Sequence, residues 1–295
     1  MKFGLSLPNF ETIATRQSIV RATQLAEEGG WDSVWVTDHV LMAIGQEHPY
    51  GHLFDGLTTL AYVAGITQRV KLGTSILVLP QRNAILVAKE VAALDQLSEG
   101  RVMLGIAPGW NEREFGFLGA DFHKRGRILD EQIAVMRTLW SQPNPAFEGR
   151  FYRFKDTIFS PKPVQAKIPI WIGGNSQAGI KRAARLGDGW HVTGLVPEHI
   201  KQMVEPVRPT ITDRPFSISV RAEVTLDGKL PADFNGPDGS PRRRLGPTTD
   251  DMVRDIQAYE KVGVEYMVLV LRDDEMSAME SHWQEIAREV LPRFK

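Results

Sequence analysis

The sequence predicts an α/β fold, a single (β/α)8 TIM barrel that spans residues 1–295. Eight short apolar segments of strand length recur along the chain, and each is followed by a stretch with helical periodicity. This alternation is typical of a parallel sheet, and eight strand-helix units are the number that closes a barrel. One such barrel commonly needs about 250 residues, which suits this chain length. An open, doubly wound sheet is the alternative that the same alternation allows.

The expected strands are the apolar segments, at residues 3–7, 33–37, 70–77, 102–106, 170–172, 190–193, 217–226 and 266–271. Helices are expected where apolar residues recur with the helical period, as in residues 129–140, 252–262 and 279–290. Residues 248–251 supply the hydroxyls and acids that favour a helix start. By the same reasoning, Asn175 or Ser176 should cap the helix that follows Gly173 and Gly174.

Two segments interrupt the alternation. Residues 144–168 combine turn residues with alternating aromatic residues, which predicts a hairpin laid over the barrel before the fifth strand. Residues 227–247 are polar and rich in glycine and proline, and a loop of about 20 residues in a compact domain is usually functional or mobile. We expect it to form a lid after strand seven. The arginine run at 242–244 could meet an anionic group, although a solvated charge run is the more ordinary interpretation.

Composition narrows the class of partner. Lys plus Arg (35) nearly balances Asp plus Glu (36), so a small-molecule substrate is expected in preference to nucleic acid or a membrane. The absence of cysteine excludes disulfides and a cysteine nucleophile. No metal site is expected, since Pro49 and Gly51 disfavour a helical His48–His52 pair. Without a signal-peptide pattern or an apolar run of about 18 residues, we expect a soluble, cytoplasmic protein.

Asp38 and His39 follow the strand at residues 33–37 directly. A parallel strand buried on both faces cannot hold an unpaired charge, so both side chains should emerge at the strand end, where barrels carry out chemistry. Imidazole titrates near neutrality, so His39 could exchange a proton with a substrate. Asp38 could fix the His39 tautomer or bind a ligand. The alternative is an ordinary solvated loop pair.

Three further strand ends carry candidate binding residues. Small residues before Ile76 would let a flat ring approach the backbone. After the next strand, Asn111 offers paired donors and acceptors, and Trp110 offers an apolar wall. Gly173–Ser176 lead into a helix start, a combination that suits a phosphate but matches neither a Walker A nor a Gly-x-Gly-x-x-Gly motif. Plain turns and a core tryptophan remain the alternatives at these places.

In this order the segments resemble the luciferase-like monooxygenase superfamily, and most closely its deazaflavin (coenzyme F420) dependent oxidoreductases. The resemblance is carried by GWDSVWVTDH, RVKLGTSILVLPQRNAILVAKEVAALDQLSEGRVMLGIAPGWNEREF, RGRILDEQIAVMRTLW and PIWIGGNSQAGIKRAARLGDGW. It implies a TIM barrel, commonly a homodimer, that binds a deazaflavin at its mouth. It also implies hydride transfer to or from a small organic substrate.

By resemblance, Asp38 and His39 lie beside the reacting ring carbon, and His39 donates or accepts the proton. A cis peptide backs the ring at Ser75–Ile76. The remaining residues implied to bind the cofactor are Ala107, Asn111, Gly173, Gly174, Asn175, Ser176, His191 and Thr193.

The chain departs from the sugar-phosphate dehydrogenases of this superfamily, which have a glutamate at the position of Pro108 and a tryptophan near Ala43. That substrate class is therefore disfavoured. One alternative function is an FMN-dependent monooxygenase that receives reduced flavin from a partner enzyme and uses oxygen. A second is a non-catalytic flavin-binding protein on the same fold.

Overall fold

The computed structural model describes residues 1–211, 214–226, 228–273 and 275–295. In these ranges, eight parallel strand positions close into a barrel, because β3 pairs with both β2 and β5 at the ends of the sheet order. The closed barrel confirms the predicted fold and excludes the open sheet. Its strands are β1 (Lys2–Ser6), β2 (Ser33–Val36), β3 (Lys71–Thr74) with β4 (Leu77–Val78), β5 (Val102–Ala107), β8 (Ile170–Gly173), β9 (Gly189–Thr193), β10 (Ser217–Glu223) and β13 (Tyr266–Val270).

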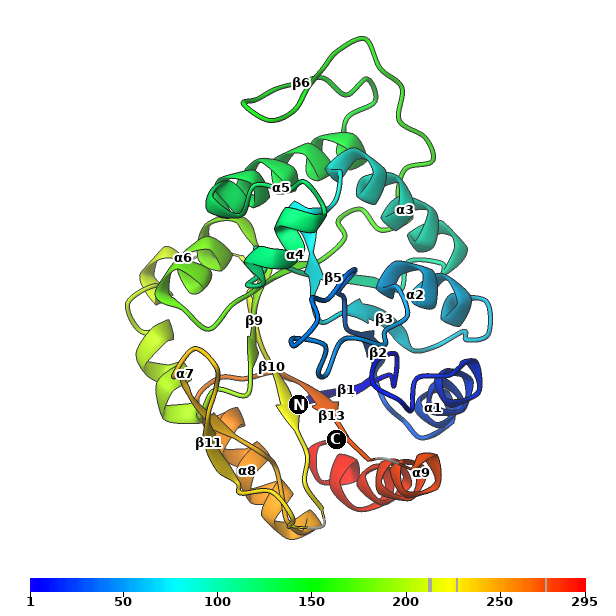
Figure 1. Cartoon of the computed structure of the whole chain (residues 1–295), viewed down its shortest axis with the longest axis vertical. Coiled ribbons are helices and arrows are strands. Elements are labelled where there is room, and N and C mark those ends of the chain that lie inside the picture. Colours follow the sequence, from blue (N-terminus) through cyan, green and yellow to red (C-terminus); the bar gives the residue numbers. More distant parts are fainter. Residues whose placement is uncertain (212–213, 227, 274) are drawn as a thin grey trace.

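Helices surround the barrel (Figure 1). They are α1 (Arg16–Glu28), α2 (Gly56–Ala64), α3 (Ala84–Leu97), α4 (Glu112–Phe117), α5 (Arg125–Ser141), α6 (Gln177–Leu186), α7 (Pro197–Val204), α8 (Thr249–Lys261) and α9 (Met276–Glu285). Thr248 caps α8 as expected, by accepting the Asp251 N–H. Ser176, and not Asn175, caps α6. Across the described ranges, no helix is both long and apolar enough to span a membrane.

Two of the predicted strands differ in extent from the structure. The strand expected over residues 70–77 is interrupted between β3 and β4, where the Ser75–Ile76 peptide bond is cis. Residues 217–226 form β10 only as far as Glu223, after which Val224 makes a single bridge to Leu245.

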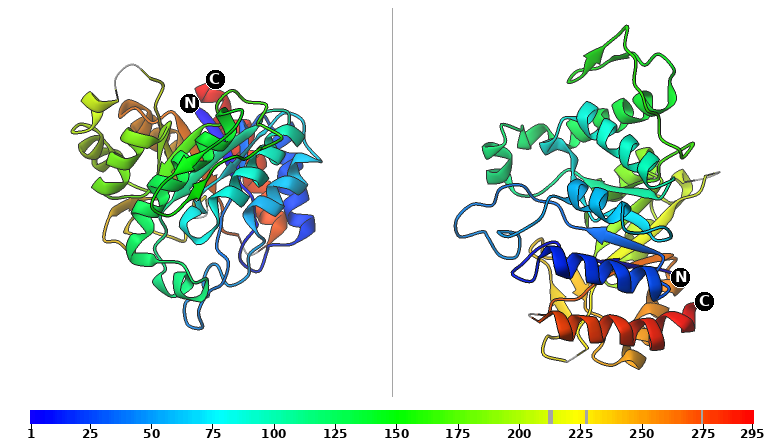
Figure 2. Two further views of the ribbon diagram at one scale, coloured as in Figure 1. Left: turned by 90° about the horizontal axis from the view of Figure 1, so that it is seen from above. Right: turned by 90° about the vertical axis from the view of Figure 1, so that its right-hand side faces the viewer.

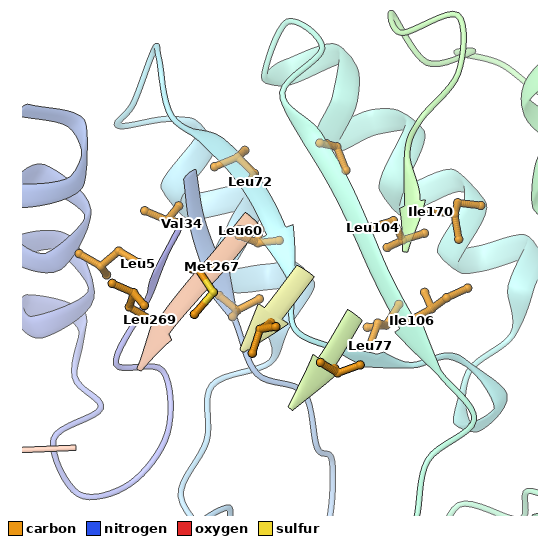
Figure 3. Packing of buried hydrophobic residues seen from close by; sticks show 14 of the residues in the cluster. Leu5, Val34, Leu60, Leu72, Leu77, Leu104, Ile106, Ile170, Met267 and Leu269 are labelled. Atoms are coloured by element: carbon orange, nitrogen blue, oxygen red, sulfur yellow. The ribbon is translucent and has the colours of Figure 1, made fainter. Parts of the chain in front are cut away.

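The core has an outer and an inner layer. Outward-facing strand residues pack against the helices, and Figure 3 shows members of this cluster such as Leu5, Val34 and Leu72. Inside the barrel, a second cluster consists of Trp35, Met103, Trp171, Tyr266 and Val268. The barrel is therefore plugged by side chains beneath its mouth, as packed TIM barrels are.

Two glycines make room for this plug. A Cβ atom at Gly4 or at Gly73 would overlap the Trp35 ring. Trp35 stacks on Trp171 with ring centres 5.4 Å apart, and its Nε1 donates to Ser33 Oγ (2.6 Å). The glycines of β1 and β3, the strands on either side of β2, therefore make room for one of the two tryptophans of the inner cluster.

The segment 144–168 forms the predicted hairpin but does not cover the barrel. Its strands β6 (Phe147–Glu148) and β7 (Arg153–Phe154) pair antiparallel, and the hairpin lies outside α5 at the top of Figure 1. The Glu131 carboxylate of α5 accepts the N–H groups of residues 150–152, and Tyr152 Oη accepts the Ala84 N–H of α3 (3.2 Å). These bonds hold the hairpin against α5 and α3, so the prediction that it lies over the barrel was wrong.

The segment after β10 is more ordered than the loop we expected. Residue 227 lies outside the described residues, but 228–247 contain a hairpin of β11 (Asp233–Asn235) and β12 (Pro241–Arg243). Arg243 N–H donates to Gly194 O (2.8 Å), which ties the hairpin to the end of β9. The arginines at 242–244 pair with Asp238, Asp233, Asp255 and Glu223. The run is therefore neither free for an anionic tail nor simply solvated.

Candidate active site

The predicted site residues gather at the carboxyl-terminal ends of the barrel strands. Strand β2 leads into a loop over residues 37–55, β5 into α4 and β8 into α6. In the right-hand view of Figure 2, the blue loop projects on the side of the barrel opposite to the two chain ends. We call this end of the barrel the mouth. It is the face at which TIM barrels carry their active sites.

His39 is held by Glu114 of α4. Its Nδ1 lies 2.8 Å from Glu114 Oε2, and both side chains are buried. Glu114 Oε1 also accepts the N–H groups of Val40 (2.6 Å) and Leu41 (3.3 Å). Burial by itself would raise the pKa of Glu114, but the hydrogen bonds from His39 and Val40 lower it to about 2. An ionised carboxylate can only accept, so Nδ1 of His39 carries a proton and Nε2 is left for a ligand.

Aromatic rings enclose the imidazole of His39. Tyr50 stacks on it with ring centres 4.4 Å apart, and Trp110 meets it edge-on at 5.8 Å. Trp110 is 59% exposed, so it is a wall of the mouth and not a core tryptophan. A cavity of about 190 Å³ is lined by His39, Tyr50 and other residues of the loop up to residue 53. The imidazole therefore lies between packed aromatic rings and open space, within reach of a substrate.

Asp38 does not orient His39, contrary to one of the roles expected for it. Consecutive residues of an extended segment point to opposite sides, so the two have different partners. Asp38 accepts from Nη2 of Arg82 (2.6 Å) and from the N–H of Val78 (3.1 Å), and Arg82 also binds Asp55 (2.8 Å). Burial raises the pKa of Asp38 above its ordinary value, while Arg82 acts in the opposite direction. Asp38 and Arg82 thus form one side of the mouth.

Ser75 and His191 lie one layer below the mouth. Ser75 Oγ is 2.7 Å from Nε2 of His191, whose Nδ1 is 2.8 Å from Ser219 Oγ. The His191 ring is buried and stacks on Trp35 at 5.7 Å. Burial lowers the pKa of His191 to about 3, so the ring is neutral near pH 7. His191 therefore supports Ser75 from below and is not itself placed to exchange protons at the mouth.

Small residues leave a shallow floor between β4, β5 and β8. A Cβ atom at Gly173 would lie 3.2 Å from both Ala107 Cβ and Ile76 Cγ2. Gly174 follows with φ of 132°, a conformation that favours glycine. Ser176 Oγ then accepts the Gly179 N–H (3.2 Å) at the start of α6. The turn thus brings backbone atoms to the mouth with no side chain in front of them.

The two asparagines expected to contact a ligand have side chains bonded to the protein. Asn175 donates to Thr193 O (2.9 Å) and accepts from Thr193 N (3.0 Å), which ties the β8 turn to β9. Asn111 is buried as the N-cap of α4, where its Oδ1 accepts the Glu114 N–H (3.4 Å). Both residues border the mouth, and Asn111 in addition fixes the helix that carries Glu114.

Sequence reasoning missed Glu114 and Arg82 as partners of His39 and Asp38. Both follow other strands, and only barrel closure brings them to the loop after β2. A signal was present for Glu114, although we did not use it: Asn111 followed by the acids Glu112 and Glu114 is typical of a helix start. Arg82 carried no comparable signal.

His48 and His52, the pair considered above for a metal, were not expected to bind one. His52 Nε2 bonds to the Ala14 carbonyl (3.0 Å). Within the residues that the structure describes, no three His, Asp or Glu side chains are grouped to hold an ion.

Comparison with known proteins gives the chain its family. Residues 1–226 match the model of luciferase-like monooxygenases. An F420-dependent glucose-6-phosphate dehydrogenase of Amycolatopsis mediterranei is 32% identical over 225 residues, 72% of this chain and 66% of the relative. The first curated relatives are likewise matched over 66% of their own length.

Solved structures share the fold over the whole chain. An F420-dependent secondary alcohol dehydrogenase in complex with an F420-acetone adduct has a TM-score of 0.81 at 18% identity, covering 100% of this chain and 99% of the other. The EDTA monooxygenase of Chelativorans sp. has a TM-score of 0.80 at 15% identity, covering 100% and 94%. With the family match over residues 1–226, the chain belongs to the luciferase-like monooxygenases, a family of oxidoreductases.

Proposed function

We propose that this protein is an oxidoreductase that transfers hydride between coenzyme F420 and a small organic substrate, with His39 as the proton donor or acceptor. The observation that carries the proposal is the His39–Glu114 pair. A buried, ionised carboxylate on Nδ1 fixes the ring and leaves Nε2 free on a side chain that lines the cavity. A general acid or base oriented by a third group is the usual arrangement for proton transfer in enzymes.

The mouth fits a planar ring with an anionic tail. Ser75, Ala107 and Gly173 form a floor of small residues, and the cis bond after Ser75 lies at its edge. The turn at Gly174 leads to the N-terminus of α6, whose first backbone N–H groups lack helical partners and suit a phosphate. When bound, F420 supplies the ring carbon that gives or takes the hydride.

The chain's own residues would then divide the work. His39 moves a proton at Nε2, and Glu114 stabilises the imidazolium when it forms. Asp38, held by Arg82, presents a fixed carboxylate at the ring edge. Tyr50 and Trp110 exclude water from the imidazole. The departures at Pro108 and Ala43 support a substrate other than a sugar phosphate.

The first test is cofactor choice, and it separates F420 from FMN. Binding of each is measured by fluorescence titration, and oxygen consumption is followed with the reduced form of each. Tighter binding of F420, with turnover that needs no oxygen, is expected. Oxygen-dependent turnover with reduced FMN would instead establish the monooxygenase alternative, for which the EDTA monooxygenase fold is a precedent.

The second test is the role of His39. His39→Ala should leave F420 affinity largely intact and lower turnover by about 100-fold or more, the usual scale for loss of a general acid or base. His123→Ala is the matched control, because His123 is exposed on the short helix after α4. Turnover equal in the two variants would remove His39 from the mechanism. Tight F420 binding without hydride exchange in the wild type would favour a non-catalytic binding protein.

A homodimer and, for the flavin alternative, a cofactor-reducing partner enzyme stay predictions from the resemblance, and a cytoplasmic location stays a prediction from the sequence pattern.

A further inference from the structure

Arg221 is a buried guanidinium inside the mouth. It lies on β10, two residues beyond Ser219, whose hydroxyl meets His191 in the barrel interior. Alternate residues of a strand share a face, so Arg221 faces inward and stands nearer the strand's carboxyl end. Only 6% of its surface is exposed. In register it lies beside Thr193 of β9, a residue already placed at the mouth.

The guanidinium of Arg221 makes no hydrogen bond and no ion pair with the described residues. Its Nε and Nη2 atoms are buried without a hydrogen bond, and it takes part in none of the ion pairs that those residues form. The nearest carboxylate on its own strand, Glu223, is bound by Arg244 (2.9 Å) and Arg272 (2.9 Å). Two guanidinium groups therefore already bind the Glu223 carboxylate, and Arg272 also binds Glu11 (3.6 Å).

A buried, unpaired guanidinium is unfavourable in a folded protein. Arginine keeps its proton under all ordinary conditions, so it cannot escape desolvation by becoming neutral. Burial lowers the pKa of Arg221, and Arg272 and Arg242 act in the same direction, while Tyr50 and Glu223 act in the opposite direction without restoring the ordinary value. Buried charges are ordinarily paired, so an uncompensated one at a ligand-binding face calls for a counter-charge from a ligand.

Aromatic contacts connect Arg221 to the candidate proton-transfer group. Its guanidinium lies 5.9 Å from the ring centre of Phe10. Phe10 lies 5.7 Å from Tyr50, and Tyr50 stacks on His39 at 4.4 Å. A ligand that reached from the open side of His39 to Arg221 would thus pass along aromatic surface before meeting a positive charge.

We infer that Arg221 is the recognition group for an anionic substrate, one that carries a carboxylate or phosphate joined to an apolar portion next to the carbon that reacts near His39. That the bound anion is a substrate rests on the proposed function, whereas the anion site itself does not depend on it. Guanidinium pairs with either anion through two parallel hydrogen bonds. The arginines at 242–244 are already paired with carboxylates, and Arg82 is paired through Nη2 with only its Nε free, whereas Arg221 has both Nε and Nη2 free.

The test compares a charged probe with its neutral analogue. Binding of benzoate, benzamide and inorganic phosphate is measured by titration calorimetry on the cofactor-free protein and on the F420-bound protein. Wild type should bind an anion at least about 10-fold more tightly than benzamide, the lower end expected for charged hydrogen bonds. A preference for benzoate identifies a carboxylate, and a preference for phosphate identifies a phosphate ester.

Arg221→Met should abolish this preference, Arg221→Lys should retain part of it, and Arg254→Gln, on the exposed face of α8, should keep it whole. Ligand-free Arg221→Met should also melt no lower than wild type, because it removes an unpaired buried charge. A melting temperature several degrees lower would overturn the inference. So would equal binding of benzoate, phosphate and benzamide by wild type.

Two results separate the site from the proposed function. If Arg221→Met weakens F420 binding about 10-fold and leaves anion binding unchanged, the counter-charge belongs to the cofactor and the substrate assignment is wrong. If wild type fails to bind F420 but shows the anion preference that Arg221→Met lacks, the proposed function falls and the anion site stands.

Discussion

Replacing Glu114 with Gln tests the residue that fixes His39. Its two oxygens accept three N–H groups, from His39, Val40 and Leu41. A glutamine has one accepting oxygen, so it can serve either the imidazole or the backbone and must turn an NH2 group toward the other. Loss of a hydrogen bond to a charged group destabilises a protein by roughly 1.5 to 3 kcal/mol, and the NH2 group of the glutamine, which would face another N–H donor, adds to this cost.

The pKa of Glu114 gives a second way to work out how much stability Glu114→Gln should lose. A shift from 4.5 in the unfolded chain to about 2 in the folded protein corresponds to about 3 kcal/mol of stability. Since the folded-state pKa is depressed, this contribution is present above pH 4.5 and is lost as the pH falls through 2. Glu114→Gln should therefore lower the free energy of unfolding by about 3 kcal/mol at pH 7 and by much less near pH 2.

Urea unfolding of wild type and Glu114→Gln between pH 7 and pH 2 measures this difference. Glu112→Gln is the matched control, because Glu112 lies on the same helix with an exposed side chain. Nitrogen NMR of the His39 imidazole adds a local readout, since the Nδ1 proton should lose its fixed partner in Glu114→Gln alone. A difference between wild type and Glu114→Gln that stays constant across the pH range would refute the reasoning.

Three further predictions concern the supporting structure. The pKa of His191 is about 3 rather than 6.5, so wild type should lose stability as the pH falls from 6.5 toward 3, by about 2 kcal/mol at pH 5. In urea unfolding, His191→Asn should show a smaller loss of stability over this pH range. Asp38→Asn should lower the free energy of unfolding by about 1.5 to 3 kcal/mol, because it removes a buried charged acceptor of Arg82 while Asp55 keeps Arg82 paired, whereas Asp55→Asn, at a half-exposed partner, should cost under about 1 kcal/mol. Gly105→Ala should sharply reduce folded yield because its Cβ would overlap the Thr74 carbonyl oxygen, and Gly116→Ala, with open space around it, should not.

The barrel could be predicted because each strand is a local pattern. Both faces of a parallel strand are buried, so each strand is a continuous apolar run in the sequence, and the sequence contains eight such runs. The error of placement concerns an insertion. The hairpin at 144–168 was expected over the barrel, but its position is set by Glu131 and Tyr152, whose bonds to residues 20 or more positions away no local pattern encodes.

The candidate site could be predicted by position but not by partner. Asp38 and His39 were found because a buried strand must expel charge at its end. Their pairing with Arg82 and Glu114 could not be found, because these partners follow different strands at separations of 44 and 75 residues. Neighbours in sequence suggested that Asp38 holds His39, and the alternation of side chains along an extended segment makes that geometry unfavourable.

The distribution of hydrogen-bonding capacity at the mouth narrows where a ligand can be recognised. Asp38 is matched by Arg82, Glu114 by His39 and two backbone N–H groups, and His191 by two serine hydroxyls. A satisfied polar group gains little from a ligand, whereas an unsatisfied buried one gains the full value of a new bond. Among the described residues of the mouth, two groups with capacity left are Nε2 of His39, whose other ring nitrogen is held by Glu114, and the guanidinium of Arg221, which has two unpaired donors where Arg82 has one. Chemistry at the first and binding at the second would together select a substrate that has a reactive carbon and an anion joined by an apolar spacer.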